Sequence, residues 1–208
     1  MDPKKIVYSG VGKNFAEIRQ ALKAGILMFN IESSQELGEI SRLAGRLKLR
    51  APVALRINPD IDPQTHPYIS TGLKKNKFGI NIDRALLDYE RAQKLPQVEV
   101  VGVACHIGSQ ITELSPFLEA VQRLRQLVEE LNRRGIHIRY LDLGGGLGIT
   151  YDQETPPHPR EYGQALIKEL EGLGVTLILE PGRVIVGNAG ILVTRVFYTK
   201  DSEAKHFI

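Results

Sequence analysis

Residues 100–146 contain the pattern that decides the fold, and they read VVGVACHIGSQITELSPFLEAVQRLRQLVEELNRRGIHIRYLDLGGG. The runs at 100–105 and 138–143 are apolar at most positions, which is typical of strands buried on both faces. Between them, apolar residues recur at helical spacing and form one stripe: Phe117, Val121, Leu124, Val128 and Leu131. The stretch therefore predicts a strand, a crossover helix and a second strand.

The same alternation runs through the rest of the chain. Strand-like runs occupy residues 6–8, 27–31, 53–57, 100–105, 138–143 and 176–179. Helical periodicity occupies residues 15–23, 35–47, 83–94, 116–134 and 160–173. For the helix at 116–134 we expect Ser115 as N-cap, Pro116 in the first turn and a left-handed Gly135 at the end. Because each helix must return the chain to the start of the next strand, the pattern predicts a parallel α/β sheet.

Two architectures place helices around a parallel sheet, a doubly wound open sheet and a (β/α)8 barrel. A barrel carries functional groups after many strands, whereas an open sheet gathers them at one switch point. Here polar groups follow almost every strand, at residues 9–10, 32–33, 56–58, 106–109, 144–146 and 180–183. We therefore expect an incomplete (β/α)8 barrel of the TIM type with about six βα units. Since a closed barrel has eight, we also expect the chain to be a fragment.

The composition is that of a soluble globular domain. The 208 residues are 42% hydrophobic and 25% charged, and a net charge of +3 does not favour nucleic acid or membrane partners. No run approaches the roughly 18–20 apolar residues of a membrane span, and no signal-peptide core is present. The single cysteine, Cys105, lies in an apolar run and is interpreted as a buried thiol. We expect a cytoplasmic protein.

Three motifs that follow strands carry the candidate chemistry. Gly144–Gly146 offers bare backbone N–H groups that suit a phosphate, although a tight turn also explains a glycine triplet. His106 can stack on an aromatic ring or transfer a proton, with a purely structural histidine as the alternative. Ser109 offers a hydroxyl to a phosphate oxygen. The five histidines do not have the spacing of a zinc site, so no metal is expected.

The third motif is Glu180-Pro181-Gly182-Arg183. A carboxylate at the end of an apolar strand needs a cation or a protonated nitrogen beside it, and a pyridinium N–H is such a partner. Arg183 can bind a phosphate or a carboxylate through two hydrogen bonds. An internal Glu180–Arg183 ion pair explains the same residues. Together the three motifs fit the binding of a phosphorylated aromatic cofactor.

With these residues in view, the chain resembles the pyridoxal-phosphate decarboxylases of the ornithine, arginine and diaminopimelate type, which have an alanine-racemase-like barrel. HIGSQ at 106–110, DLGGGLG at 142–148 and EPGR at 180–183 carry the general resemblance. RINPDIDPQTHPYISTG at 56–72 and NKFG at 76–79 resemble the diaminopimelate decarboxylase branch. By residue type alone, this long basic segment could bind substrate or form a solvated lid.

The resemblance implies pyridoxal 5′-phosphate as cofactor and decarboxylation of meso-diaminopimelate to L-lysine, a step of lysine biosynthesis. The residues implied to bind the cofactor are His106, Ser109, Gly144, Gly145, Gly146, Glu180, Pro181, Gly182 and Arg183. His106 is implied to stack on the ring and Glu180 to pair with the ring nitrogen. Arg183 is implied to lie near the phosphate and the substrate carboxylate. A small amino-acid substrate and a homodimeric full-length enzyme are the implied partners.

Two family features are missing. The Tyr-Ala-x-Lys-Ala-like phrase that anchors the cofactor has no match, and Lys13 corresponds to another family position. Residues 1–190 match barrel strands three to eight, and residues 191–208 match only the start of the family's C-terminal β-domain. We therefore expect little or no activity from this chain alone. The alternatives are a decarboxylase of ornithine, arginine or a polyamine precursor, a non-catalytic barrel that binds the same cofactor, and a generic phosphate-binding barrel.

Overall fold

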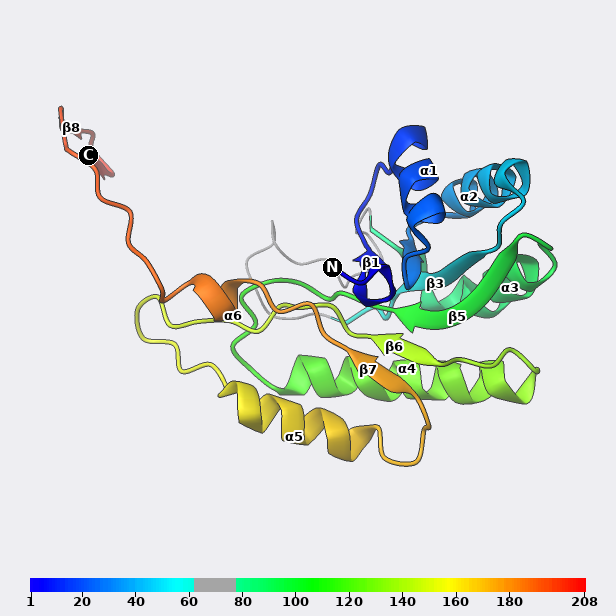
Figure 1. The fold of residues 1–208 in the computed structure, drawn as a ribbon. Helices are drawn as coiled ribbons and strands as arrows, with labels where there is room; N and C mark the ends of the chain where they lie inside the picture. Colours follow the sequence, from blue (N-terminus) through cyan, green and yellow to red (C-terminus); the bar gives the residue numbers. More distant parts are fainter. Residues whose placement is uncertain (62–77) are drawn as a thin grey trace.

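The computed structural model describes residues 1–61 and 78–208, and it shows a curved parallel sheet covered by helices (Figure 1). The neighbouring strands of the sheet follow one another in chain order: β1 (Val7–Tyr8), β2 (Met28–Ile31), β3 (Ala51–Asn58), β5 (Val98–Ala104), β6 (Tyr140–Asp142) and β7 (Thr176–Ile178). The two-residue strand β4 (Ile80–Asn81) pairs with the end of β3. Because the order never reverses within the described part, the barrel prediction is confirmed over the open sheet.

Five helices cover the outer face, as predicted: α1 (Phe15–Ala24), α2 (Ser34–Leu47), α3 (Ile82–Gln93), α4 (Ser115–Arg133) and α5 (Pro159–Glu169). The N-cap prediction for α4 is wrong. The helix begins at Ser115, and its N-cap is Leu114, which makes no capping side-chain hydrogen bond. Leu114 packs against the core instead of capping the helix with a polar side chain. The prediction for Gly135 is confirmed, since its φ is +78°.

The sheet curls so that its inner face holds a second, smaller core. Met28, Ala54, Val101 and Ala104 are buried there, and side chains from the two outermost strands pack against them: Val7 of β1 and Ile178 of β7. Strands at opposite ends of the sheet therefore share one cluster. This curvature draws the carboxyl ends of all the strands toward one another.

An irregularity between β3 and β5 is completed by a side chain from α3. Val53 pairs with Val100 but Ala54 pairs with Gly102, so one extra residue bulges from β5. The fully buried hydroxyl of Tyr89 accepts a hydrogen bond from the Leu55 amide, at 3.3 Å, and donates to the Gly102 carbonyl oxygen, at 2.9 Å. Tyr89 thus bonds to backbone groups of both strands beside the bulge.

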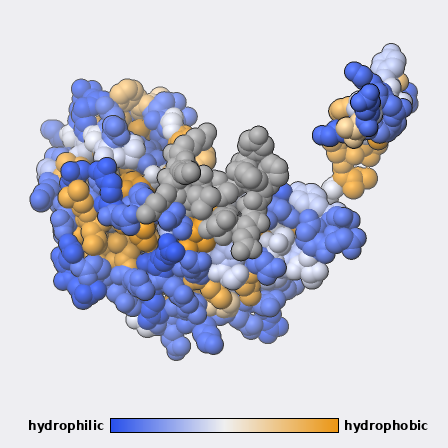
Figure 2. All heavy atoms as spheres, turned by 180° about the vertical axis from the view of Figure 1, so that it is seen from behind, coloured by the Kyte–Doolittle hydropathy of each residue, from blue (hydrophilic) through white to orange (hydrophobic). Residues whose placement is uncertain are grey.

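The C-terminal segment leaves the barrel. A short helix, α6 (Arg183–Val186), follows β7, and β8 (Lys200–Asp201) pairs with β9 (His206–Phe207) at the end. The end of the chain stands away from the body of the molecule (Figures 1 and 2). The apolar side chains between α6 and β8 are exposed, among them Ile191, Leu192, Val193 and Phe197. The division into residues 1–190 and 191–208 stays a prediction.

Most of the basic segment between Arg56 and Gly79, which was expected to bind substrate or form a lid, lies outside the described residues. In the described part, the helices are all too short or too polar to cross a membrane.

We predict that Tyr89→Phe lowers the free energy of unfolding by about 1–3 kcal/mol. The substitution removes the hydrogen bonds that the Tyr89 hydroxyl makes to the buried Leu55 N–H and Gly102 C=O groups. Urea denaturation followed by circular dichroism measures the change. Tyr198→Phe, which alters an exposed tyrosine, is the matched control. Equal stability of the two variants would contradict this account of the bulge.

Candidate active site

A cavity of about 320 Å³ lies at the carboxyl ends of the strands. Its described lining consists of Ser9, Gly10, Asn30, Arg56, Ala104, Cys105, His106 and Glu180. These residues come from the ends of β1, β2, β3, β5 and β7, which the curvature of the sheet brings together. Hollows of comparable size elsewhere on the described surface contain none of the predicted site residues.

A chain of hydrogen bonds crosses the floor of this cavity. The Asn30 amide nitrogen donates to Ser9 Oγ, at 2.8 Å, and to Asp142 Oδ2, at 2.7 Å. Because the Ser9 oxygen accepts from Asn30, its hydroxyl hydrogen goes to Glu180 Oε1, at 2.6 Å. The chain links the two ends of the curled sheet, since Ser9 follows β1 and Glu180 follows β7. Glu180 is thereby held toward the cavity.

Asn30 has an unsatisfied atom that indicates its role. Its Oδ1 is buried and has no hydrogen-bond partner among the described residues. Leaving such an oxygen without a donor costs on the order of 1–3 kcal/mol. The placement of its amide nitrogen between Ser9 and Asp142 accounts for the orientation despite that cost.

Asp142 is fully buried and carries an unusual carboxyl group. Burial, and then the nearby negative charge of Glu180, raise the pKa of Asp142 to about 7. Hydrogen bonds from the Gly144 amide, at 2.9 Å, and from Asn30 act in the opposite direction. Two carboxyl groups this near each other, one of them buried, favour a shared proton, or a cation that enters between them.

His106 lies at the end of β5 with its ring anchored on one side. Its Nδ1 accepts a hydrogen bond from the Gly145 amide, at 3.2 Å, so the ring hydrogen of the neutral form is on Nε2. Burial, followed by the positive charge of Arg56, lowers the pKa of His106. The imidazole is therefore neutral near pH 7 and presents a flat, uncharged surface. Burial raises the pKa of the neighbouring Cys105 to about 12, which fits the predicted structural thiol.

The glycine turn after β6 approaches its neighbours too closely for side chains. A Cβ on Gly144 would lie 2.6 Å from His106 Nδ1, and one on Gly145 would lie 2.3 Å from the Glu180 carbonyl oxygen. The Gly144 and Gly145 amides already donate to Asp142 and His106. Of the three amides expected to bind a phosphate, only that of Gly146 has no acceptor among the described residues.

Arg183 lies across the turn from this glycine. Its guanidinium donates to Tyr151 Oη, at 3.0 Å, and to Ser109 Oγ, at 3.4 Å. Pro181 and Gly182 form the exposed turn that separates it from Glu180. The described residues contain no Glu180–Arg183 ion pair, so the two side chains do not neutralise each other. The carboxylate bonds to Ser9 after β1, whereas the guanidinium bonds to Ser109 after β5 and to Tyr151 after β6.

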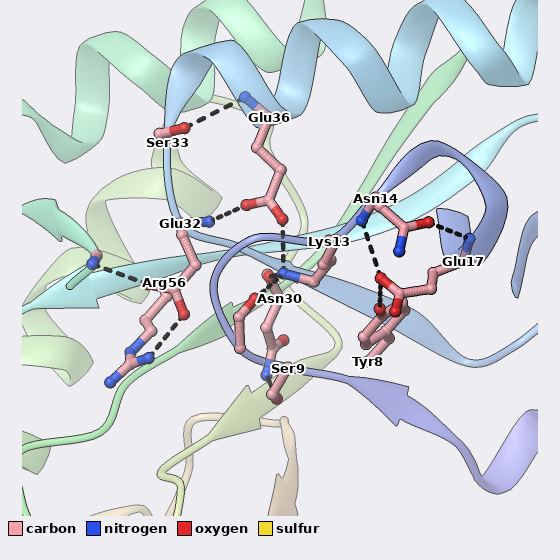
Figure 3. A network of polar contacts seen from close by, with 12 residues as sticks. Tyr8, Ser9, Lys13, Asn14, Glu17, Asn30, Glu32, Ser33, Glu36 and Arg56 are labelled. Atoms are coloured by element: carbon pink, nitrogen blue, oxygen red, sulfur yellow. Dashed lines mark hydrogen bonds and ion pairs between the residues drawn. The ribbon is translucent and has the colours of Figure 1, made fainter. Parts of the chain in front are cut away.

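An ion-pair network supports the cavity from behind (Figure 3). The buried Lys13 ammonium donates to the carbonyl oxygens of Gly10 and Asn30 and to Glu36 Oε1, at 2.5, 2.8 and 2.6 Å. Glu36 also accepts from the Glu32 amide, and Glu32 pairs with Arg56 at 2.7 Å. All three ammonium hydrogens of Lys13 are used, so the lysine fixes the Ser9–Gly10 loop.

Sequence reasoning gave no specific role to four groups that shape this site, although it counted the first of them among the polar groups at strand ends: Ser9, Asn30, Asp142 and Tyr151. One signal was available for two of them. Asn30 interrupts the apolar run MFNI, and Asp142 interrupts YLDL, just as Glu180 ends an apolar run. A polar side chain in a strand buried on both faces needs a partner, so such interruptions mark where strands meet at a polar site.

These groups fit a phosphorylated pyridine ring. The cavity holds a carboxylate for a protonated ring nitrogen and a flat neutral imidazole for a ring face. The Arg183 guanidinium and the Gly146 amide, which suit a phosphate, lie in the loops after β7 and β6 and are not among the described residues that line it. The unsatisfied Asn30 Oδ1 and the glycine contacts show that the cavity is built at a cost to packing. None of the described lining residues is a lysine.

We predict that the wild-type chain loses stability as the pH rises from about 4 to about 7, and that Asp142→Asn abolishes this pH dependence. The pKa of Asp142 is near 7 in the folded chain and about 3.9 when unfolded, so the folded state retains a proton that the unfolded state releases. The free energy of unfolding of the wild type therefore falls as the pH rises through this interval. Urea titrations at several pH values measure it. Asp83→Asn, on the exposed first turn of α3, should keep the wild-type pH dependence.

The chain is similar to known proteins of one family over most of its length. The model of the family "Pyridoxal-dependent decarboxylase, pyridoxal binding domain" matches residues 1–187. Diaminopimelate decarboxylase of Pseudomonas aeruginosa is 56% identical over 206 residues, which are 99% of this chain and 50% of that protein. That of Vibrio cholerae is 54% identical over 207 residues, again 99% of this chain and 50% of that protein.

Solved structures show the same relation. The crystal structure of diaminopimelate decarboxylase from Helicobacter pylori complexed with L-lysine matches with a TM-score of 0.91 and 45% identity, over 99% of this chain and 52% of that one. The chain spans about half the length of the curated relatives it matches. With its fold, its strand-end motifs and this match over residues 1–187, the chain belongs to the pyridoxal-dependent decarboxylase family, in the part that forms the pyridoxal binding domain.

Proposed function

We propose that this chain is the cofactor-binding part of a diaminopimelate decarboxylase, which removes CO2 from meso-diaminopimelate to give L-lysine. The observation that carries the proposal is the convergence of Glu180, His106 and Arg183 on one edge of the curled sheet. The identity of 54–56% to relatives of that name supports the substrate.

Each group has a distinct task. Pyridoxal phosphate, when bound, supplies a protonated pyridine ring that accepts the electron pair left by a departing carboxylate. Glu180, fixed by Ser9, holds the proton on the ring nitrogen, and neutral His106 packs on the ring without competing for that proton. Ser109, the Gly146 amide and Arg183 hold the phosphate, and Arg183 also attracts the substrate carboxylate.

The extent of the domains and the assembly are part of the same proposal. Residues 1–190 form the barrel portion, supported by the family match to residue 187, and residues 191–208 begin the following β-domain. The exposed apolar side chains of residues 191–198 support this, since such a run needs a partner to cover it. The complete enzyme is a cytoplasmic homodimer, and size-exclusion chromatography with light scattering tests the dimer.

We predict that Glu180→Gln weakens binding of pyridoxine 5′-phosphate about tenfold and leaves its bound ring unprotonated, because a neutral amide does not stabilise the ring N–H. Pyridoxine 5′-phosphate lacks the aldehyde and so cannot attach to surface lysines. Its ultraviolet absorption reports the ring's protonation directly. Glu203→Gln, at an exposed position in the β8–β9 turn, is the control. A protonated bound ring in the Glu180→Gln variant would exclude the proposed role of Glu180.

The substrate proposal is tested by release of CO2 from meso-diaminopimelate, ornithine, arginine and lysine in the presence of pyridoxal phosphate. The longer protein that contains this sequence should act on meso-diaminopimelate with the highest kcat/KM. The 208-residue chain should bind the cofactor but show little turnover, since it lacks the phrase that anchors the cofactor in the family and none of the described residues that line the cavity is a lysine. Preference for another amino acid would assign the chain to a different decarboxylase. Full turnover and a borohydride-reducible lysine adduct in the chain itself would disprove the expected inactivity.

A further inference from the structure

Tyr151, in the loop after β6, is the side chain that holds Arg183 in place. Arg183 Nη1 donates to the phenol oxygen at 3.0 Å, and the guanidinium carbon lies 5.6 Å from the centre of the tyrosine ring. On its other side, Nη2 donates to Ser109 Oγ at 3.4 Å. The guanidinium is therefore held between two hydroxyl groups from different strand-end loops.

The donor and acceptor roles of the two hydroxyl groups follow from the chemistry of Arg183. A guanidinium has only donors, so Tyr151 Oη and Ser109 Oγ both act as acceptors toward it. Each hydroxyl keeps one hydrogen, and neither hydrogen has an acceptor among the described residues. Nor does any carboxylate in that part of the chain pair with Arg183. One positive charge and two unused O–H donors therefore share one place.

The loop that carries Tyr151 is built to hold it there. The Gln110 side-chain amide forms hydrogen bonds with both the nitrogen and the oxygen of Ile149, at 3.1 and 2.5 Å. On the other side, the Glu154 carboxylate accepts the amides of Tyr151 and Asp152, at 3.0 and 2.7 Å. The tyrosine is thus fixed on both sides, although its own side chain is largely exposed.

We propose that the Tyr151 hydroxyl is a further phosphate-binding group of this chain, which donates its hydrogen to a phosphate oxygen while its ring and oxygen orient Arg183. A phosphate carries several acceptor oxygens and about two negative charges, which matches one guanidinium and two hydroxyl donors better than a single carboxylate does. The inference rests on the proposed function, because it concerns the phosphate of the same cofactor.

The test compares two probes on the whole 208-residue chain. Pyridoxine 5′-phosphate and pyridoxine share the ring and lack an aldehyde, and they differ only in the phosphate. Dissociation constants are measured by equilibrium dialysis for the wild type, Tyr151→Phe and the exposed control Tyr198→Phe. Tyr151→Phe keeps the aromatic ring over Arg183 and removes only the hydroxyl. Circular dichroism checks that each variant is folded.

We expect Tyr151→Phe to weaken binding of pyridoxine 5′-phosphate about tenfold and to leave binding of pyridoxine unchanged. Inorganic phosphate should compete with pyridoxine 5′-phosphate in the wild type and less well in Tyr151→Phe. Tyr198→Phe should match the wild type with both probes.

The possible failures are distinguishable. If the wild type binds neither probe, or binds both equally, cofactor binding by this chain is wrong, and the inference falls with it. If the wild type prefers the phosphorylated probe and Tyr151→Phe keeps that preference, only the role of Tyr151 is wrong. An equal loss for both probes would show a general structural effect and would also overturn it.

Discussion

The hydrogen bonds that converge on the buried carboxylate of Asp142 hold the functional edge of this sheet together. Asp142 ends β6, yet its oxygens accept from Asn30 of β2 and from the glycine turn. Through Asn30 and Ser9 the same chain reaches Glu180 after β7. A curled parallel sheet brings these strand ends together, and their polar groups must then satisfy one another or a ligand. The geometry of the site follows from that requirement.

Around this centre, the polar groups divide into two sets. Lys13, Glu36 and Glu32 are used in pairing and fix the loops behind the cavity. In the second set, Glu180 accepts a hydrogen bond from a hydroxyl, His106 accepts one from a backbone amide, and Arg183 donates to two hydroxyls. Neutral partners orient a side chain without cancelling its charge or its basicity. The second set is thus preorganised for a ligand that carries both a cation and an anion.

The sequence predicted the barrel's visible strands and helices because each depends on a local, repeating apolar pattern, as in α4. It missed features that depend on a neighbour distant in the chain. Leu114 takes the N-cap position of α4 and packs against the core, and Tyr89 of α3 bonds to backbone groups beside the β3–β5 bulge. The glycine triplet was expected to offer its amides to a phosphate. Two of those amides are used by Asp142 and His106, which local spacing cannot reveal.

The sequence by itself determined the element order, the parallel sheet and the motifs at the strand ends, since periodicity and residue type are properties of short segments. Only the tertiary structure decided which of these side chains meet. The bond from Ser9 to Glu180 joins residues 171 positions apart, and it exists because the sheet curls. The same curvature places Tyr151 and Ser109 on either side of Arg183. The residue types at the strand ends determine which chemical groups are available, and the curvature of the sheet determines which of them meet.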